Sequence, residues 1–333
     1  MSLPRIAIAL GDPAGIGPEI ALKAALDRRV RQIARPLLVG SRRVLETHAA
    51  LCGLSPALAV FGSAEAIAWP AEALPLLDVP AEPPRLGEIA PAHGRAAIDA
   101  ARAAIAAALA AKVDAVVAAP QTERAIKAAG IDFDGYPSFV ARATGLPAED
   151  AFLMLCFDAT RIVHTTLHAS LRRAIELVTQ DRVGKAIAAA DTTLRRLGIA
   201  APRLAVAGLN PHAGEDGMFG SEEQEIIAPA VAAAQRRGVT AEGPFGCDTM
   251  FQRRGYDAFI VMYHDQGHIA AKLQAPNRTA GLTIGTPVLF SSVAHGSALD
   301  IAGRNRATPE AMIEAIERLA GAARRSTRNS GAG

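Results

Sequence analysis

Cysteine is scarce in this chain of 333 residues, and its three cysteines form no CxxC pair. An odd number of isolated cysteines does not provide a disulfide framework, and it favours a reducing cytoplasm. Charge of one sign is also lacking, because 35 basic residues are matched by 33 acidic ones. The basic residues are scattered, so the sequence offers no clustered basic face of the kind that nucleic-acid binding requires.

The sequence contains no strong membrane signal either. The alanine-rich stretch 96–111 is interrupted by Asp99 and Arg102 and is followed by Lys112. Alanine favours a helix more than it favours lipid, so we interpret this stretch as a packed helix. The first residues run directly into a strand-like segment, without a recognisable signal peptide. We therefore expect a soluble, cytoplasmic protein with a large core and no membrane or nucleic-acid partner.

Strand-like runs alternate with helical ones along the chain, and no internal repeat is visible. This rhythm predicts an α/β fold whose mainly parallel sheet is covered by helices on both faces. The chain length suggests two lobes. The strand-like runs are Ile6–Leu10, Leu37–Gly40, Ala115–Ala119, Arg203–Leu209 and Tyr256–Tyr263.

A glycine-rich motif, GDPAGIGPE at residues 11–19, lies between a predicted strand and a predicted helix. Such a turn can present backbone N–H groups to an anion at the start of a helix. Its glycine spacing is not that of a dinucleotide fingerprint, and Asp12 would repel a phosphate. A tight turn that needs glycine torsion angles is an equally good interpretation.

Three histidines each follow an apolar, strand-like run: His168, His212 and His264. Ligands collect at the ends of strands in open α/β sheets. Three imidazoles gathered there, with carboxylates nearby, would form an open metal site that can polarise an oxygen of a substrate. Taken singly, a histidine is more often structural, and we assign that role to His48, His93 and His164.

Other polar residues near these motifs are candidates for proton transfer and carboxylate positioning. Lys272, Asp248 and Asp265 are the best of them. Lys272 could instead be a solvated surface residue, and Asp248 an N-cap. His268 is ambiguous, because it lies one turn after His264 only if that segment is helical.

The segment HGSALDIAG, at residues 295–303, resembles the cofactor loop of isocitrate and isopropylmalate dehydrogenases. That resemblance implies a nicotinamide dinucleotide bound without a Rossmann domain. The alternative is a glycine-punctuated loop that leads into the last helix. The expected cofactor contacts are His295, Gly296, Ser297, Ala298 and Asp300.

Five segments together resemble the 4-hydroxythreonine-4-phosphate dehydrogenase family over nearly the whole chain: GDPAGIGPEI (11–20), GLNPHAGE (208–215), DTMF (248–251), MYHDQG (262–267) and SALDIAG (297–303). The resemblance implies an isocitrate/isopropylmalate-dehydrogenase-like, two-lobed α/β/α fold with its active site in the interlobe cleft. It also implies NAD, with NADP as the alternative, and a homodimer. A divalent metal, zinc by preference, would be held by His168, His212 and His264 from both subunits. Lys272 would fall at the family's substrate-contacting lysine.

The lobes implied by this resemblance are a cofactor-side lobe and a lobe for substrate, metal and dimerisation. We place the first at residues 1–130 plus 275–333 and the second at residues 131–274.

The chain departs from the family where phosphate is bound. The family's Gly-His-Thr-Glu segment is GYPS here, so that Tyr136 and Ser138 line the substrate position. The substrate-binding asparagine and arginine fall at Gly281 and Phe290, and a family lysine falls at Glu123. Charge-assisted hydrogen bonds contribute about 1.5–3 kcal/mol each. Losing two would weaken phosphate binding at least about a hundredfold, so we expect a substrate that is not a phosphate. Tyr136, Gly281 and Phe290 would shape a flatter, less anionic pocket suited to a ring.

Within the family, the chain is most similar to the terephthalate cis-dihydrodiol dehydrogenases. The segments that carry this likeness are GYPS (135–138), FLML (152–155), HDQGH (264–268) and SSVAHGSA (291–298). It implies NAD-dependent, metal-assisted oxidation of the dihydrodiol dicarboxylate, with release of carbon dioxide and formation of protocatechuate. The alternatives are the vitamin B6 enzyme itself, a dehydrogenase for another phosphorylated sugar acid, and a non-catalytic metabolite-binding protein.

Overall fold

The structure, a computed structural model, describes residues 3–275, 279–293 and 295–329. It divides into two compact units, one formed by residues 1–133 and 287–333 and the other by residues 134–286. The second unit thus extends to residue 286, one strand beyond the approximate boundary expected at residue 275. The reason is that β11 (Ala280–Ile284) pairs antiparallel with β6 (Phe152–Phe157), which fixes it in the second unit.

The first unit contains a parallel sheet in the order β3-β4-β2-β1-β5-β12. Its central strands are buried along almost their whole length, as expected of a parallel sheet covered on both faces. The strands are β1 (Arg5–Ala9), β2 (Arg35–Gly40), β3 (Leu58–Phe61), β4 (Leu74–Asp78), β5 (Ala115–Ala118) and β12 (Phe290–Val293).

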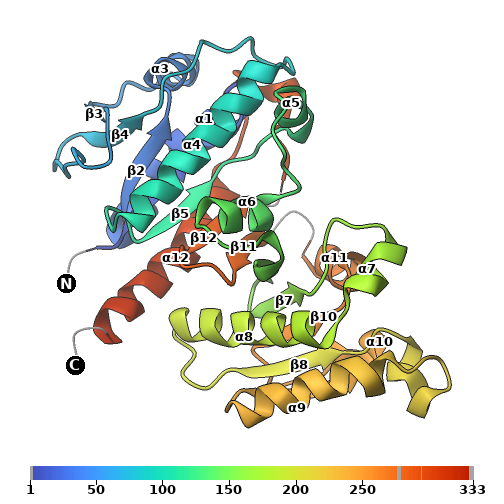
Figure 1. Cartoon of the computed structure of the whole chain (residues 1–333). Coiled ribbons are helices and arrows are strands. Elements are labelled where there is room, and N and C mark those ends of the chain that lie inside the picture. Colours follow the sequence, from blue (N-terminus) through green and yellow to red (C-terminus); the bar gives the residue numbers. More distant parts are fainter. Residues whose placement is uncertain (1–2, 276–278, 294, 330–333) are drawn as a thin grey trace. The chain divides into compact units, whose positions relative to one another are not determined.

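Helices cover both faces of this sheet. The connection through α1 runs from β1 to β2, whereas the connection through α4 runs in the opposite direction, from β4 to β5. Right-handed crossovers then place α1 and α4 on opposite faces (Figure 1). The helices are α1 (Gly17–Leu26), α2 (Arg28–Ile33), α3 (Arg42–Leu51), α4 (Pro91–Leu109), α5 (Glu123–Ala128), the short η4 (Leu299–Ile301) and α12 (Glu310–Asn329). The predicted alanine-rich helix is confirmed as α4.

The second unit contains a mixed sheet in the order β11-β6-β7-β10-β8-β9. Strand β6 is antiparallel to both of its neighbours, β11 and β7, and β7, β10, β8 and β9 are parallel. The mainly parallel α/β prediction is confirmed, except that the β6–β7 hairpin was not foreseen. The remaining strands are β7 (Thr160–His164), β8 (Arg203–Ala207), β9 (Thr240–Phe245) and β10 (Ala258–Val261).

The helices of the second unit pack against this sheet. Helix α8 contacts five of its strands, and α11 contacts β6, β7 and β10. The helices are α6 (Tyr136–Ala143), α7 (Leu171–Leu177), α8 (Gln180–Arg196), α9 (Ala228–Arg236), α10 (Cys247–Met250) and α11 (His264–Gln274), with shorter helical segments η1 (Ala148–Asp150), η2 (Pro211–Gly217) and η3 (Glu223–Ile227).

Three neighbouring parallel strands, β7, β10 and β8, end at the same edge of the second sheet. The chain continues from these ends to His168, His264 and His212, respectively. The sequence-based placement of all three histidines just beyond strand ends is therefore confirmed. This edge is where an open α/β sheet positions ligands.

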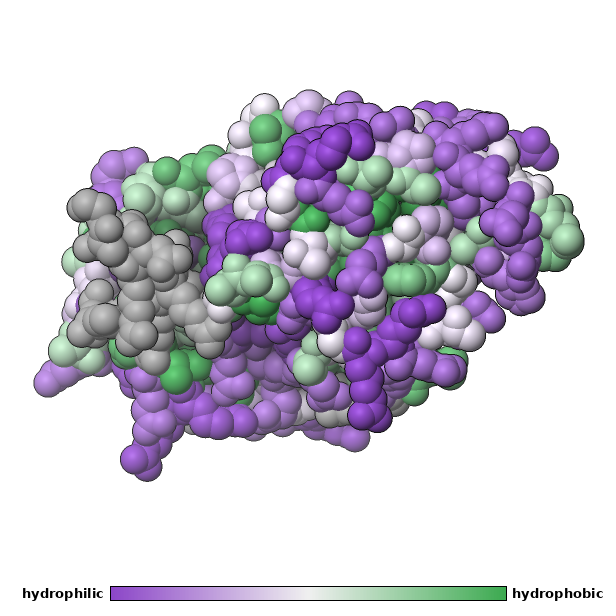
Figure 2. All heavy atoms as spheres, turned by 90° about the horizontal axis from the view of Figure 1, so that it is seen from below, coloured by the Kyte–Doolittle hydropathy of each residue, from purple (hydrophilic) through white to green (hydrophobic). Residues whose placement is uncertain are grey.

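The surface is mainly hydrophilic on the face shown in Figure 2, where hydrophobic residues form small separate areas. Within the ranges that the structure describes, no helix has the length and apolarity needed to cross a membrane.

The close approach of α4 and α5 gives a stability test. A Cβ added to Gly94 would lie 2.3 Å from the carbonyl carbon of Ala125, whereas a Cβ on Gly184 in α8 meets nothing within 4 Å. We expect Gly94→Ala to lower the free energy of unfolding by about 1–3 kcal/mol through overpacking. The control Gly184→Ala should raise it by about 0.5–1 kcal/mol. Urea unfolding measures both; equal effects of the two substitutions would contradict this packing.

Candidate functional site

Four histidines gather where β7 and β10 end. His164 is the last residue of β7, His168 lies in the loop after it, His264 begins α11, and His268 lies one turn further along that helix. The rings of His168 and His264 have centroids 6.0 Å apart. The rings of His264 and His268 stack at 3.7 Å, with an angle of 7° between their planes. The alternation of strand and helix thus brings together imidazoles that are 100 residues apart in sequence.

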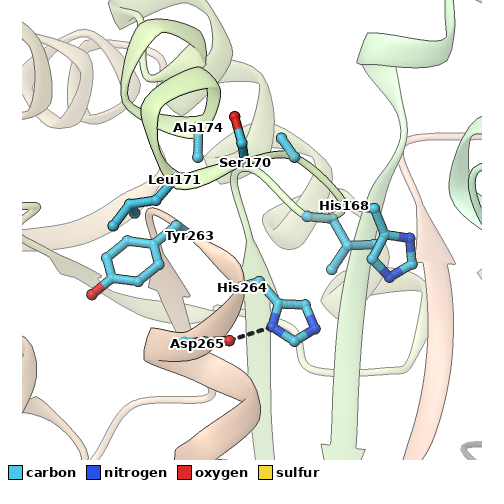
Figure 3. Close-up of a pocket in the computed structure, with 9 residues that line it drawn as sticks. His168, Ser170, Leu171, Ala174, Tyr263, His264 and Asp265 are labelled. Atoms are coloured by element: carbon cyan, nitrogen blue, oxygen red, sulfur yellow. Dashed lines mark hydrogen bonds and ion pairs between the residues drawn. The ribbon is translucent and has the colours of Figure 1, made fainter.

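His168 and His264 line one open pocket of about 500 Å³. Figure 3 shows their rings side by side in this pocket, with Asp265 beside His264. His168 Nδ1 lies 2.7 Å from the backbone oxygen of Asp134, and His264 Nδ1 lies 2.7 Å from Asp265 Oδ1. In each ring, a hydrogen bond at Nδ1 leaves Nε2 as the nitrogen with a lone pair for a metal ion.

His212 lies in η2, beyond the end of β8. Its Nδ1 is 3.0 Å from Glu215 Oε1, so its Nε2 also remains as a donor atom. The backbone from residue 212 to residue 216 has positive φ throughout, a conformation that costs L-residues roughly 1–2 kcal/mol each. Strain of this kind persists where the surroundings enforce it, and it concentrates at functional sites.

Glu223, which no sequence motif indicated, supports the loop that carries His212. Its side chain is 3% exposed, and its carboxylate accepts hydrogen bonds from the backbone N–H groups of Leu209 and Asn210, both at 2.7 Å. A second oxygen of the same carboxylate accepts from the Asn210 amide at 3.0 Å. Nothing in the spacing of residues 208–223 separates this buried glutamate from its exposed acidic neighbours.

Asp248 lies in the same neighbourhood as His212. A Cβ added to Gly246 would lie 2.8 Å from Asp248 Oδ1 and 3.4 Å from His212 Cα. The N-cap of α10 is Gly246, so the capping interpretation of Asp248 is wrong. Lys272 is exposed on α11, two turns after His264. Asp265 is also largely exposed.

The predicted metal ligands therefore form two groups, His168 with His264, and His212. Among the residues that the structure describes, no three His, Cys, Asp or Glu side chains are placed to hold one metal ion. Each group nevertheless fits metal chemistry, because every ring has its Nδ1 bound to an oxygen and its Nε2 left as a donor.

His268 and His164 form a pair of a different kind. His268 Nδ1 lies 3.1 Å from His164 Nε2, and His164 Nδ1 lies 3.4 Å from the backbone oxygen of Leu153. Burial, followed by the nearby His268, lowers the pKa of His164 to about 3. Burial also lowers the pKa of His268 to about 4. Because both pKa values are lowered, both rings are neutral near pH 7. Helix α11 is confirmed around His268, and the His268 ring stacks on that of His264.

The predicted substrate segment lies next to His168. A Cβ added to Gly135 would lie 3.4 Å from His168 Nδ1. The Ser138 hydroxyl, 8% exposed as a residue, bonds to the Asp134 carboxylate, and Asp134 also holds His168 through its backbone oxygen. Burial raises the pKa of Tyr136, which keeps its hydroxyl neutral.

Gly281 and Phe290 lie inside their sheets. Gly281 is buried in β11 opposite Leu155, and Phe290 is 1% exposed in β12 opposite Val116. Neither position supplies a polar or cationic side chain to a ligand.

The predicted cofactor residues follow β12 in the first unit. Ser297 is 6% exposed, and Ala298 has a left-handed backbone with φ of 41°. Gly296 is exposed, and a Cβ there would meet nothing within 4 Å, so the backbone is open to close approach. His295 is partly exposed and Asp300 is exposed. An open backbone flanked by polar side chains fits a dinucleotide.

Comparison with known proteins places this geometry in a family. Residues 32–319 match the model for the pyridoxal phosphate biosynthetic protein PdxA. The chain belongs to the PdxA family. Its curated relatives include the 1,2-dihydroxy-3,5-cyclohexadiene-1,4-dicarboxylate dehydrogenase of a Comamonas species, 42% identical over 95% of this chain and 96% of that one. They also include the D-threonate 4-phosphate dehydrogenase of Cupriavidus necator, 38% identical over 94% and 96%.

Solved structures agree with this assignment. A 4-hydroxythreonine-4-phosphate dehydrogenase from Klebsiella pneumoniae has a TM-score of 0.83 and 36% identity, covering 96% of this chain and 99% of its own. A terephthalate 1,2-cis-dihydrodiol dehydrogenase from Burkholderia xenovorans has a TM-score of 0.72 and 41% identity, covering 96% and 98%. The resemblance expected from the sequence is confirmed, and the PdxA-family chain is an oxidoreductase of the dehydrogenase type.

The neutral His164 predicts a pH dependence. The unfolded chain takes up a proton at this position below about pH 6.5, whereas folded His164 stays neutral down to about pH 3. Stability contributed by this depressed pKa is therefore lost as the pH falls through that window. The substitution His164→Leu removes this titrating group from the metal-free protein. Between pH 6.5 and 4.5, the free energy of unfolding of the variant should therefore fall less steeply with decreasing pH than that of wild type, by a slope that corresponds to about one proton. Urea unfolding at a series of pH values measures this slope, and identical slopes would contradict the assignment.

Proposed function

We propose that this protein is an NAD-dependent, metal-assisted dehydrogenase that oxidises and decarboxylates a cis-dihydrodiol carboxylate. The proposed reaction converts the terephthalate 1,2-cis-dihydrodiol to protocatechuate and carbon dioxide. The observation that carries the proposal is that this chain has Gly281 and Phe290 where the resemblance places the family's substrate-binding asparagine and arginine, while the set of histidines is retained. The identity of 42% to a dehydrogenase named for this dicarboxylate supports it.

The substrate positions favour a ring over a phosphate. Phe290 is buried and apolar, Gly281 offers no side chain, and the GYPS segment next to His168 offers a neutral tyrosine and a serine. A phosphate carries close to two negative charges at neutral pH and is bound mainly by charge-assisted hydrogen bonds. The position that corresponds to the family arginine therefore discriminates against phosphorylated substrates.

The chemistry follows from the relation of hydroxyl to carboxylate. The hydroxyl carbon of the dihydrodiol is β to a carboxylate, so loss of its hydride to NAD and of its hydroxyl proton gives a β-keto acid. Carbon dioxide then leaves with the C–C bond electrons remaining as an enolate, which is the aromatic phenolate. A proton added to its oxygen gives protocatechuate. A divalent ion, zinc by preference, would act as a Lewis acid on the reacting oxygen.

The residues of the chain have separate roles in this proposal. The Nε2 atoms of His168, His212 and His264 would hold the metal ion, since their Nδ1 atoms are bound to oxygens. Lys272, with Asp248 or Asp265, would position the carboxylate and move the hydroxyl proton. His295, Gly296, Ser297, Ala298 and Asp300 would contact NAD. The isocitrate-dehydrogenase-like arrangement of two lobes belongs to the same proposal.

A second candidate is oxidation of a phosphorylated sugar acid. The relative from Cupriavidus necator, named a D-threonate 4-phosphate dehydrogenase, is 38% identical and favours it. It would require phosphate contacts other than those at Gly281 and Phe290.

A substrate comparison separates these candidates. The purified protein, loaded with metal, is offered NAD with the terephthalate dihydrodiol, 4-hydroxythreonine 4-phosphate or D-threonate 4-phosphate, and NADH is followed at 340 nm. We expect kcat/KM for the dihydrodiol to exceed that for either phosphate by at least about a hundredfold, since two or more charge-assisted hydrogen bonds are missing. Equal or better turnover of a phosphate would reject the substrate assignment.

We also propose that two copies of the chain share each metal site. His168 and His264 of one subunit would combine with His212 of the other, because the described residues of one chain present these ligands as two groups and not as one. Exposed apolar side chains flank both groups and are suited to an interface between copies: Leu171, Met218, Phe219, Ile269 and Leu273.

Subunit mixing tests the shared site. Co-expressed His212→Ala and His264→Ala chains form heterodimers in which one site has all its ligands and the other lacks two. We expect each variant alone to lose its metal and the co-expressed pair to regain up to about a quarter of the wild-type content, for statistical pairing. Metal analysis by mass spectrometry measures this.

The matched control is co-expression of His168→Ala with His264→Ala. Both substitutions then affect the same half of the site, so every site in every dimer lacks a ligand. Recovery of metal by this control pair, or none by the first pair, would contradict a shared site.

A further inference from the structure

Backbone N–H groups of the GDPAGIGPE motif form hydrogen bonds inside the protein. The N–H of Asp12 bonds to the oxygen of Pro120 at 2.9 Å, and that of Gly15 to the oxygen of Asp12 at 3.2 Å. The N–H of Ala14 bonds to Asp12 Oδ1 at 2.9 Å, and Asp12 is 1% exposed. From Asp12 to Ile16, every backbone N–H is bonded inside the protein, so this part of the turn offers no N–H group to an anion.

The N–H of Ile16 bonds to the predicted cofactor loop, residues 295–303. The N–H of Ile16 bonds to the oxygen of Ser297 at 2.9 Å. A Cβ added to Gly15 would lie 2.6 Å from that same oxygen and 2.7 Å from the Ser297 Cβ. Only glycine therefore allows Ser297 to lie where it does.

Thr122 holds the side chain of Ser297. Its hydroxyl lies 3.0 Å from the Ser297 hydroxyl, with Thr122 as donor. The hydrogen of Ser297 then remains available for an acceptor on a ligand. Thr122 is the N-cap of α5, yet its side chain makes no capping hydrogen bond, so its hydroxyl is committed to Ser297.

The far end of the loop is held by helix α1. Glu19, whose side chain is fully buried, accepts the N–H of Ala307 at 2.9 Å. Lys23 donates to the oxygen of Ala307 at 2.9 Å and pairs with Glu19 at 2.6 Å. Gly87 lies between the two segments, since its N–H bonds to the oxygen of Ala14 and a Cβ added to it would lie 3.1 Å from the oxygen of Leu299.

We propose that the GDPAGIGPE motif and Thr122 are the positioning elements of the dinucleotide site, fixing the 295–307 loop before the cofactor binds. Gly15 and Thr122 hold Ser297 at one end, and Glu19 and Lys23 hold Ala307 at the other. A loop already fixed in its bound shape loses less conformational entropy on binding, which strengthens affinity. This inference rests on the proposed binding of NAD by residues 295–300.

The test measures NADH binding to the full-length protein by fluorescence titration. We expect Gly15→Ala to weaken binding at least tenfold, because Ser297 must move. Thr122→Val has nearly the same shape without the hydroxyl, and it should weaken binding about two- to tenfold, as expected for one neutral hydrogen bond. Thr122→Ser, which keeps the hydroxyl, should stay within about twofold of wild type.

The matched control is Gly62→Ala, because a Cβ on Gly62 meets nothing within 4 Å; it should bind NADH as wild type does. In steady-state assays, the KM for NAD should rise in Gly15→Ala and Thr122→Val while kcat at saturating NAD and metal content stay unchanged. A general folding defect would change all three.

The outcomes separate this inference from the function on which it rests. Wild-type binding of NADH together with unaltered binding in both Gly15→Ala and Thr122→Val would overturn the positioning role alone. Absence of NADH binding by wild type would overturn the cofactor assignment, and the positioning role with it. If Gly15→Ala does not fold, Thr122→Val and its Thr122→Ser rescue decide the result.

Discussion

The hydrogen bond at Nδ1 of each candidate ligand is the constraint on which this account depends. Imidazole can bind a metal through either nitrogen, and an oxygen at one nitrogen fixes the ring and leaves the other as the donor. Asp134, Asp265 and Glu215 supply that oxygen to His168, His264 and His212. The strand order β7-β10-β8 supplies the common edge, and the stacked His268, held by His164, supports His264 from behind.

In the proposed function, the two units would contribute different parts of the chemistry. The second unit carries the histidines, the carboxylates and the GYPS segment. The first carries a loop whose two ends are held by helix α1 and the turn before it. A dehydrogenase needs both a polarised carbinol and a fixed hydride acceptor, and in the proposed function a separate segment would meet each need. Gly281 and Phe290 would then select among substrates without disturbing either segment.

Much of the fold could be predicted from the sequence, because alternating apolar runs and helical stretches determine an α/β arrangement. The position of the three histidines beyond strand ends followed from the same pattern. The β6–β7 hairpin, the left-handed run at His212 and the support by Glu223 could not be predicted, since they depend on tertiary contacts. The pairing of His164 with His268 was missed because the two rings are 104 residues apart. The GDPAGIGPE motif stayed open between two interpretations until its N–H partners were known.

Anomalous diffraction at the metal absorption edge, from crystals of the metal-loaded protein, shows directly which histidine nitrogens bind the metal. We expect one peak per chain, about 2.0–2.1 Å from the Nε2 atoms of His168, His264 and His212, with His212 from a second copy and each Nδ1 still bound to its oxygen. A peak at Nδ1 of any of these rings, or a metal bound only by His164 and His268, would contradict this expectation.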